Sequence, residues 1–122
     1  MRHNIKTTDF SMTPAIKDHI EKRMTHLNKF VNPNHADLPM CYVEIGKTTN
    51  HHKSGDLFRA EFTVYIGSKS LRAEAVEEDL YAALDKITEE MTEELKSMKD
   101  KKVSLLRRGG AKLKSLLKSF YG

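Results

Sequence analysis

The stretch FRAEFTVYIGSKSLRAEA, residues 58–75, decides the fold class of this 122-residue chain. Apolar and polar residues alternate up to Ile66 and again from Leu71, which is the period of a β-strand with one buried face. Between the two runs, the sequence GSK at residues 67–69 is typical of a tight turn. The stretch therefore predicts a β-hairpin with one apolar and one polar face.

A third strand precedes this hairpin. Cys41, Val43 and Ile45 alternate with Tyr42 and Glu44 in the same half-buried pattern. The chain from residue 41 to residue 75 is therefore predicted to form a three-stranded meander. The segment between its first two strands holds two adjacent histidines, two lysines and a glycine, so it could be a metal site, a catalytic site or a long hairpin loop.

Two amphipathic helices are predicted on either side of the meander. Thr13 followed by Pro14 is typical of a helix N-cap and first turn. The helix that starts there is expected to end near Phe30, and its apolar stripe is Ile16, Ile20, Met24, Leu27 and Val31. The second helix is expected to run at least to Lys102, with the stripe Leu80, Leu84, Ile87, Met91, Leu95 and Met98. Negative charge at its start comes from Glu77, Glu78 and Asp79.

The order of the elements predicts an α+β fold. NIKTTDF, residues 4–10, is the expected first strand, and VNPNHADLP, residues 31–39, is a loop because of its prolines and asparagines. The order is thus β-α-β-β-β-α, with a four-stranded sheet. Since each helix has one apolar stripe, the simplest packing places both helices on one face of the sheet. We expect one domain over residues 1–102 and a basic amphipathic C-terminal tail over residues 103–122.

Positive charge is concentrated at the end of the chain. Residues 1–95 carry 12 Lys/Arg and 16 Asp/Glu, a net of −4, whereas residues 96–122 carry 9 and 1, a net of +8. A concentrated cationic segment favours a polyanionic partner, because neutralised phosphates release their condensed counterions. A solvated, disordered tail is the alternative explanation.

Neither the histidines nor the lone cysteine form a recognisable catalytic or metal site. His51 and His52 are adjacent, so their side chains point to opposite sides of an extended chain. GKTT, residues 46–49, lacks the upstream glycine and the following helix of a phosphate-binding loop. Cys41 is the only cysteine, which excludes an internal disulfide and fits a reducing compartment. We expect no enzyme activity, no metal and no cofactor.

Four blocks of the sequence together resemble a known family. They are TPAIKDHIEKRMTHLNKF, VEIGKTTNHHKSGDLFRAEF, LRAEA and EDLYAALDKI, and the resemblance around them runs from about Asn4 to Lys102. In this order they resemble the ribosome hibernation promoting factors, also called ribosome-associated translation inhibitors or sigma-54 modulation proteins. The resemblance implies a domain similar to double-stranded RNA-binding domains, docked on the small ribosomal subunit in the channel of the mRNA and tRNA anticodon arms.

The resemblance also implies which residues contact ribosomal RNA (rRNA). In the first helix, the basic positions that match the family pattern are Lys17, Arg23 and Lys29. Lys22 joins them on helical geometry alone, and Tyr81 could either pack at the edge of the core or meet RNA. The residues that most resemble the tip of the family's long hairpin are His51, His52, Lys53 and Gly55. The possible RNA contacts among them are His51, His52 and Lys53.

The second helix departs from the family pattern. Family members usually carry Lys or Arg along its middle, but this chain has Glu90, Glu93 and Glu94 there. Carboxylates repel phosphate at close range, so this surface would bind through magnesium or water, or the contact has shifted along the helix. We favour the shift, onto Lys96, Lys99, Lys101 and Lys102, and we expect Arg107 and Arg108 of the basic tail to bind rRNA as well.

We interpret the chain as a non-enzymatic ribosome hibernation factor of the short type. The 20 residues after Lys102 are too few for the second, ribosome-dimerising domain of long-type members. With no apolar run of membrane-spanning length and no signal peptide, we expect a cytoplasmic protein whose partner is the small subunit. The alternative is an RNA-binding or membrane-surface recruiting module that acts through the tail, whose apolar face is Leu113, Leu116, Leu117 and Phe120.

Overall fold

The computed structural model describes residues 1–31, 39–49 and 55–107, with side chains through Lys101. Its elements are β1 (Arg2–Thr8), α1 (Pro14–Asn28), β2 (Met40–Thr49), β3 (Asp56–Ile66), β4 (Lys69–Glu77) and α2 (Leu80–Arg107). This order confirms the predicted α+β fold. The first strand begins and ends two residues earlier than expected, because the chain turns at Asp9, whose φ of 62° lies outside the β region.

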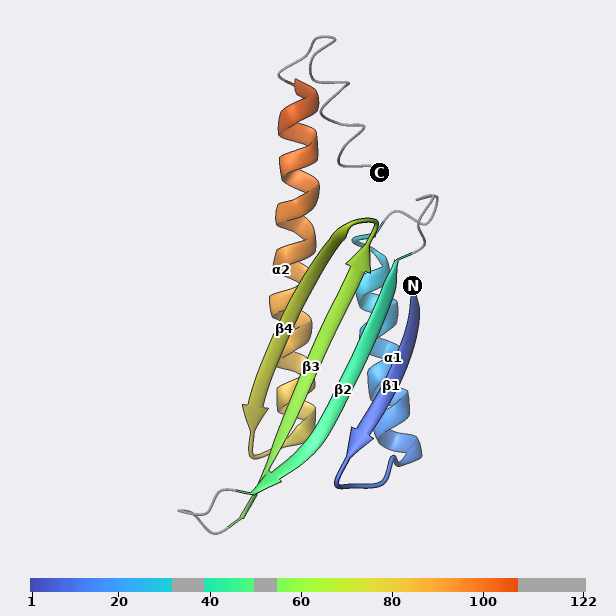
Figure 1. Cartoon of the computed structure of the whole chain (residues 1–122), viewed down its shortest axis with the longest axis vertical. Helices are drawn as coiled ribbons and strands as arrows, with labels where there is room; N and C mark the ends of the chain where they lie inside the picture. The colour runs from blue at the N-terminus through green and yellow to red at the C-terminus, as the bar shows by residue number, and fades with distance from the viewer. Residues whose placement is uncertain (32–38, 50–54, 108–122) are drawn as a thin grey trace.

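The four strands form one sheet in the order β1-β2-β3-β4. β1 runs parallel to β2, and the other two pairs are antiparallel. Both helices lie on the same face of the sheet, and α2 extends well past its end (Figure 1). Among the described residues, no helix lies on the opposite face of the sheet (Figure 1).

The core lies between the sheet and the two helices. β3 contributes Ala60, Phe62 and Val64, all fully buried, because its odd-numbered neighbours point to the open face. The helices contribute the predicted stripes, including Ile20 and Leu27 from α1. The fully buried residues of α2 are Ala83, Leu84, Ile87, Met91 and Leu95. The periodicity of the sequence therefore identified the buried faces of β2, β3, β4 and the two helices.

Local signals set the ends of the elements. The Thr13 hydroxyl accepts a hydrogen bond from the backbone N–H of Ile16 at 3.2 Å, as an N-cap does. The two-residue turn between β3 and β4 begins with Gly67, whose φ of 60° suits the first position of a type II′ turn. At the start of α2, Asp79 Oδ1 accepts from the N–H of Tyr81 at 3.2 Å. The acidic residues thus precede α2, and none lies in its first turn.

Candidate RNA interface

The outer surface of the helix layer holds most of the predicted RNA-binding residues that the structure describes. In α1, Lys17, Lys22 and Lys29 are exposed. At 100° per residue, Lys22 and Lys29 lie together on the side opposite buried Ile20, whereas Lys17 lies on the flank away from α2. Lys22 forms an i,i+4 ion pair with Asp18 at 3.1 Å. The structure therefore separates Lys17 from the other two lysines.

Arg23 is held in the groove between the two helices by a carboxylate of α2. Its Nε lies 3.2 Å from Asp85 Oδ1, although its N–H makes no hydrogen bond among the described residues. The same Asp85 oxygen lies 2.8 Å from His19 Nε2, and the His19 ring meets the ring of Tyr81 edge to face at 4.9 Å. Asp85 thus links α1 to α2, and Arg23 keeps only about a third of its side chain exposed (35%).

The groove between the helices has mixed charge. It is lined by Arg23, His26, Asp85, Thr88, Glu89, Thr92 and Glu93. The two threonine hydroxyls donate to the carbonyls of Leu84 and Thr88, each at 2.7 Å, so they are satisfied within α2. Of the three acidic residues that depart from the family pattern, only Glu93 lines this groove. Glu90 and Glu94 lie on the other flank of α2 by helical geometry.

Farther along α2, cations replace the carboxylates beside α1. Lys96 Nζ lies 5.5 Å from the centroid of the Phe30 ring, a cation–π geometry, and 3.9 Å from Glu93 Oε1. Lys96 thus contacts the end of α1 at Phe30, the residue that follows Lys29. Lys99 is exposed on the same flank of α2, and Lys101 is exposed on the opposite flank.

Several predicted site residues cannot be placed. The backbone of Lys102 and Arg107 belongs to α2, but their side chains lie outside the described part of the chain. His51, His52, Lys53 and Arg108 lie outside the described residues altogether. Within the described residues, no three His, Cys, Asp or Glu side chains are grouped to hold a metal ion. No helix among those residues is long and apolar enough to cross a bilayer.

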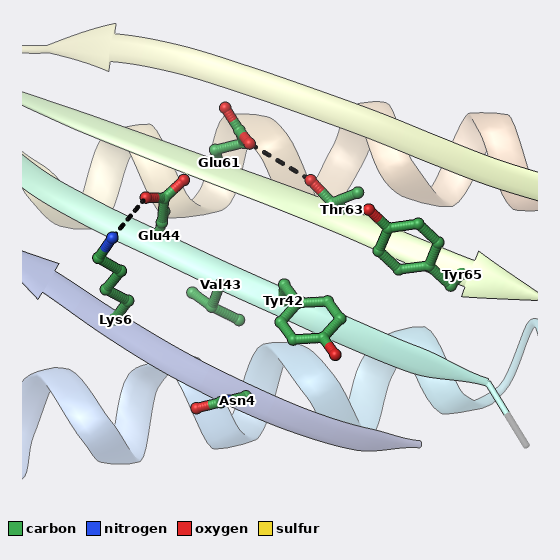
Figure 2. A pocket seen from close by; sticks show the side chains of 8 residues that line it. All are labelled: Asn4, Lys6, Tyr42, Val43, Glu44, Glu61, Thr63 and Tyr65. Atoms are coloured by element: carbon green, nitrogen blue, oxygen red, sulfur yellow. Dashed lines mark hydrogen bonds and ion pairs between the residues drawn. The ribbon is translucent and has the colours of Figure 1, made fainter.

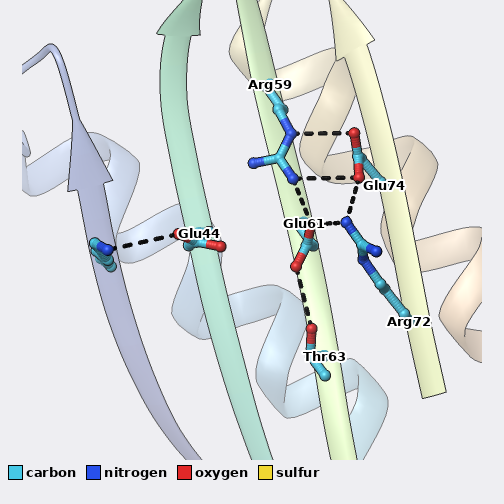
Figure 3. Close-up of polar contacts among 7 residues, drawn as sticks. Glu44, Arg59, Glu61, Thr63, Arg72 and Glu74 are labelled. Carbon is cyan, nitrogen blue, oxygen red and sulfur yellow. Dashed lines mark hydrogen bonds and ion pairs between the residues drawn. The ribbon is translucent and has the colours of Figure 1, made fainter. Parts of the chain in front are cut away.

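On the open face of the sheet, an ion-pair network joins β3 and β4 (Figure 3). Glu61, whose side chain is only 10% exposed, lies 2.5 Å from Arg59 Nη2 and 2.7 Å from Arg72 Nη2. Glu74 accepts from Arg59 Nε at 3.0 Å, and this hydrogen bond lowers the pKa of Glu74 and raises that of Arg59. The two arginine charges are thus largely compensated within the sheet.

Two tyrosines lie side by side on the same face (Figure 2). The rings of Tyr42 and Tyr65 meet edge to face at 5.6 Å, and their exposed fractions are 48% and 47%. Sequence reasoning noted Tyr42 only as a polar-face residue and assigned it no role. The alternation of residues places both tyrosines on the outer face, but their contact depends on the pairing of β2 with β3.

The fold is shared with two solved structures. The crystal structure of the Thermus thermophilus Protein Y N-terminal domain covers 80% of this chain and 98% of its own, with a TM-score of 0.64 and 23% identity. A ribosomal subunit interface protein from Coxiella burnetii covers the same shares at a TM-score of 0.58 and 17% identity. These likenesses define the chain as an α+β domain of the Protein Y type.

The sequence then gives the particular family. Residues 3–103 match the family of sigma 54 modulation protein / S30EA ribosomal protein, and the chain belongs to it. Ribosome-associated factor Y of Haemophilus influenzae is 27% identical over 114 residues, which cover 93% of this chain and 95% of that protein. The ribosome hibernation promotion factor of Bacillus subtilis is 29% identical over 101 residues, or 83% of this chain. The chain spans only about half (50%) of that longer relative.

These findings confirm the resemblance drawn from the four sequence blocks. The relatives are named as ribosome-associated factors and not as enzymes. A ribosomal partner for this chain is therefore in keeping with the family to which it belongs.

Proposed function

We propose that the protein is a non-enzymatic ribosome hibernation factor that binds the small subunit in the mRNA and tRNA channel. There it inhibits translation and preserves idle ribosomes in the cytoplasm. The observation that carries the proposal is the group of exposed cations on the helix layer of a domain from this family. We define the helix-side cations as Lys22, Arg23, Lys29, Lys96 and Lys99.

The proposed mechanism is steric and electrostatic. Lysine and arginine side chains bind rRNA phosphates and fix the position of the domain, and its volume then excludes mRNA and tRNA. Lys29 and Lys99 are the most available of these cations, because both are exposed and neither forms an ion pair within the described side chains. Arg23 has the lesser role, since Asp85 already compensates its charge.

The acidic middle of α2 is compatible with this contact. Glu90 and Glu94 lie away from the groove, and Glu93 is paired with Lys96. The rRNA contact therefore runs along α1 and crosses to α2 at Lys96 and Lys99, beyond the acidic stretch. This arrangement supports the shift of contact toward the C-terminal part of α2.

The test compares two double charge reversals in sedimentation with purified small subunits. Lys29→Glu with Lys99→Glu removes helix-side cations, whereas Lys69→Glu with Lys86→Glu makes the same change in net charge on the β4 side of the molecule. Circular dichroism checks that both variants are folded. We expect the first variant to lose roughly tenfold or more in affinity and the second to lose much less.

The salt dependence gives a second readout of the same contact. Each phosphate contact contributes roughly 0.7 to 0.9 to the slope of log affinity against log salt, so the first variant should lower the slope by about 1.5. It should also relieve inhibition in a purified translation system. Equal losses of affinity for the two variants would contradict a contact through the helix layer.

A further inference from the structure

The open face of the sheet has no part in the proposed function, which uses the helix layer. We infer that this face is a second RNA-binding surface that takes two unpaired nucleotides. Their bases stack on Tyr42 and Tyr65, and their phosphates lie near Arg2 and Lys6. The inference goes beyond the proposed function and does not depend on which surface meets the small subunit.

The stacking platform is the tyrosine pair. Nearly half of the surface of each residue is exposed, at 48% for Tyr42 and 47% for Tyr65. They belong to neighbouring strands, and the pairing of Tyr42 with Thr63 makes Tyr65 its diagonal neighbour. Both side chains point away from the helices (Figure 2). Aromatic side chains on an open sheet are the usual platform for splayed-out bases.

A hollow beside the tyrosines offers hydrogen-bonding groups to the edges of a base. It has a volume of about 340 Å³ and is lined by Asn4, Lys6, Tyr42, Val43, Glu44, Glu61, Thr63 and Tyr65. The Glu61 carboxylate already accepts hydrogen bonds from Arg59, Arg72 and Thr63. Glu44 has only a 3.8 Å ion pair with Lys6 and remains 42% exposed, so it can accept from the amino group of a base. Asn4 supplies both an acceptor and donors.

The cations for the phosphates lie on β1, along one side of the tyrosines. The outward residues of this strand are Arg2, Asn4 and Lys6, which pair with Met40, Tyr42 and Glu44 of β2. Lys6 lies four residue steps along the strand from Arg2, or about 13 Å away. This length suits a short strand of RNA whose bases reach across β2 toward β3. Lys6 is 74% exposed, and its pair with Glu44 is weak enough for a phosphate to replace.

The charge pattern limits the ligand to a short single strand. Beyond the tyrosines, Lys6, Glu44, Glu61 and Glu74 face one another across the four strands. Each carboxylate of this row is paired with Lys6, Arg59 or Arg72, so the row offers no net positive charge to a phosphate backbone that continued in that direction. Arg59 and Arg72 cannot extend the cationic track, because Glu61 and Glu74 compensate them. An RNA duplex, which is bound through a longer row of phosphates, would not fit this surface.

Tyrosine-specific NMR tests the site directly. The chain has four tyrosines and no tryptophan, so incorporation of 3-fluorotyrosine gives a simple fluorine spectrum with Tyr81 as an internal reference on the helix side. A single-stranded RNA hexamer should shift the signals of Tyr42 and Tyr65, and a duplex of the same length should not. An unchanged spectrum with the hexamer, or equal shifts with the duplex, would overturn the inference.

Variants on the same face separate stacking from other contacts. The double variant Tyr42→Ala with Tyr65→Ala should bind a fluorescein-labelled RNA hexamer at least fivefold more weakly, because stacking contributes roughly 1–3 kcal/mol per base. The matched control, Val76→Ala, removes another exposed apolar side chain of the open face and should have no effect. The pair Tyr42→Phe and Tyr65→Phe retains both rings and should retain binding.

Charge removal on β1 gives an independent readout. Arg2→Gln with Lys6→Gln should lower the salt slope for the hexamer by about 1.4, at roughly 0.7 per phosphate on single strands. If the variant Tyr42→Ala with Tyr65→Ala weakens binding to the small subunit and leaves the affinity for the hexamer unchanged, the open face of the sheet contacts a protein. In that case the RNA inference is wrong. Binding of the hexamer to the sheet and binding of the helix layer to the small subunit are measured separately. Either the RNA inference or the proposed function can therefore be contradicted without the other.

Discussion

At the scale of single residues, Cys41 illustrates how burial controls chemistry in this protein. It lies on the core side of β2 with no exposed surface. Burial raises the pKa of its thiol to about 12, because the thiolate would lose its hydration. The only cysteine of the chain is therefore a small core residue with an unreactive thiol.

We predict that Cys41 does not react with iodoacetamide at pH 8 in the folded protein and reacts rapidly in concentrated urea. Mass spectrometry after a short pulse measures the labelled fraction. Complete labelling of the folded protein within the pulse would show that this part of the sheet opens readily.

The raised pKa also predicts how stability changes at high pH. The unfolded chain releases the thiol proton above about pH 9, and the folded chain holds it up to about pH 12. The free energy of unfolding should therefore fall by about 1.4 kcal/mol per pH unit in this window, with no thiol contribution below it. Urea titrations of the protein and of Cys41→Ala at pH 8 and 10 isolate this effect. Parallel losses in both proteins would contradict it.

At the scale of elements, the ion-pair network of β3 and β4 and the capping of α1 set local stability. Glu61 and Glu74 face each other across the two strands, an arrangement that alone would be destabilising. Arg59 and Arg72 make the arrangement stabilising, because each arginine forms ion pairs with both carboxylates.

We predict that Glu74→Gln destabilises the protein at pH 7 by up to about 1 kcal/mol, a value limited by solvent screening. The pKa of Glu74 is lowered by Arg59, so its stabilisation is present above the ordinary carboxyl pKa and is lost as the pH falls through the lowered value. Urea titrations at pH 7 and pH 3 should show a smaller difference at pH 3 than at pH 7. Glu78→Gln, at an exposed position just beyond β4, is the control. A difference of the same size at both pH values would point to packing in place of charge.

We predict that Thr13→Ala costs about 1 kcal/mol, because the N–H of Ile16 loses its capping acceptor. Thr13→Ser keeps a hydroxyl and should cost much less. Thermal unfolding followed by circular dichroism measures both. Similar losses for the two variants would mean that the threonine methyl group, and not the cap, is important.

The elements themselves could be predicted because their signals are local. Alternation defined the strands, three- and four-residue spacing defined the helices, and Thr13-Pro14 and Gly67 marked a start and a turn. The links between elements could not be predicted in this way. Asp85 meets His19 across 66 residues of sequence, and the contact of Tyr42 with Tyr65 depends on strand register. The sequence alone likewise could not show that Glu93 lies in the groove beside α1 and Glu90 on the other flank of α2, because this depends on the position of α1.

At the scale of the whole molecule, charge is distributed unevenly along the chain. The first 95 residues are net negative, and the remaining 27 carry nine Lys/Arg and one Asp/Glu. The described core reaches only to Met98, whereas α2 continues to Arg107. The folded core and the most cationic part of the chain are thus largely separate in sequence.

We predict that deletion of residues 108–122 leaves the unfolding midpoint nearly unchanged, because the described core lies before this segment. Affinity for small subunits should fall tenfold or more. The deleted segment carries Arg108, Lys112, Lys114 and Lys118, and four cations at about 0.5 kcal/mol each approach 2 kcal/mol. Titration with labelled protein measures the loss. Unchanged subunit affinity with lost binding to anionic vesicles would assign the segment to a membrane.

We propose that the helix layer binds the small subunit in its mRNA and tRNA channel. A cryo-EM map of the protein added to vacant small subunits would show this contact directly. We expect density for the domain within the channel, with α1 and the Lys96–Lys99 part of α2 against rRNA phosphates. A domain bound outside the channel, or bound with α1 turned toward solvent, would contradict it.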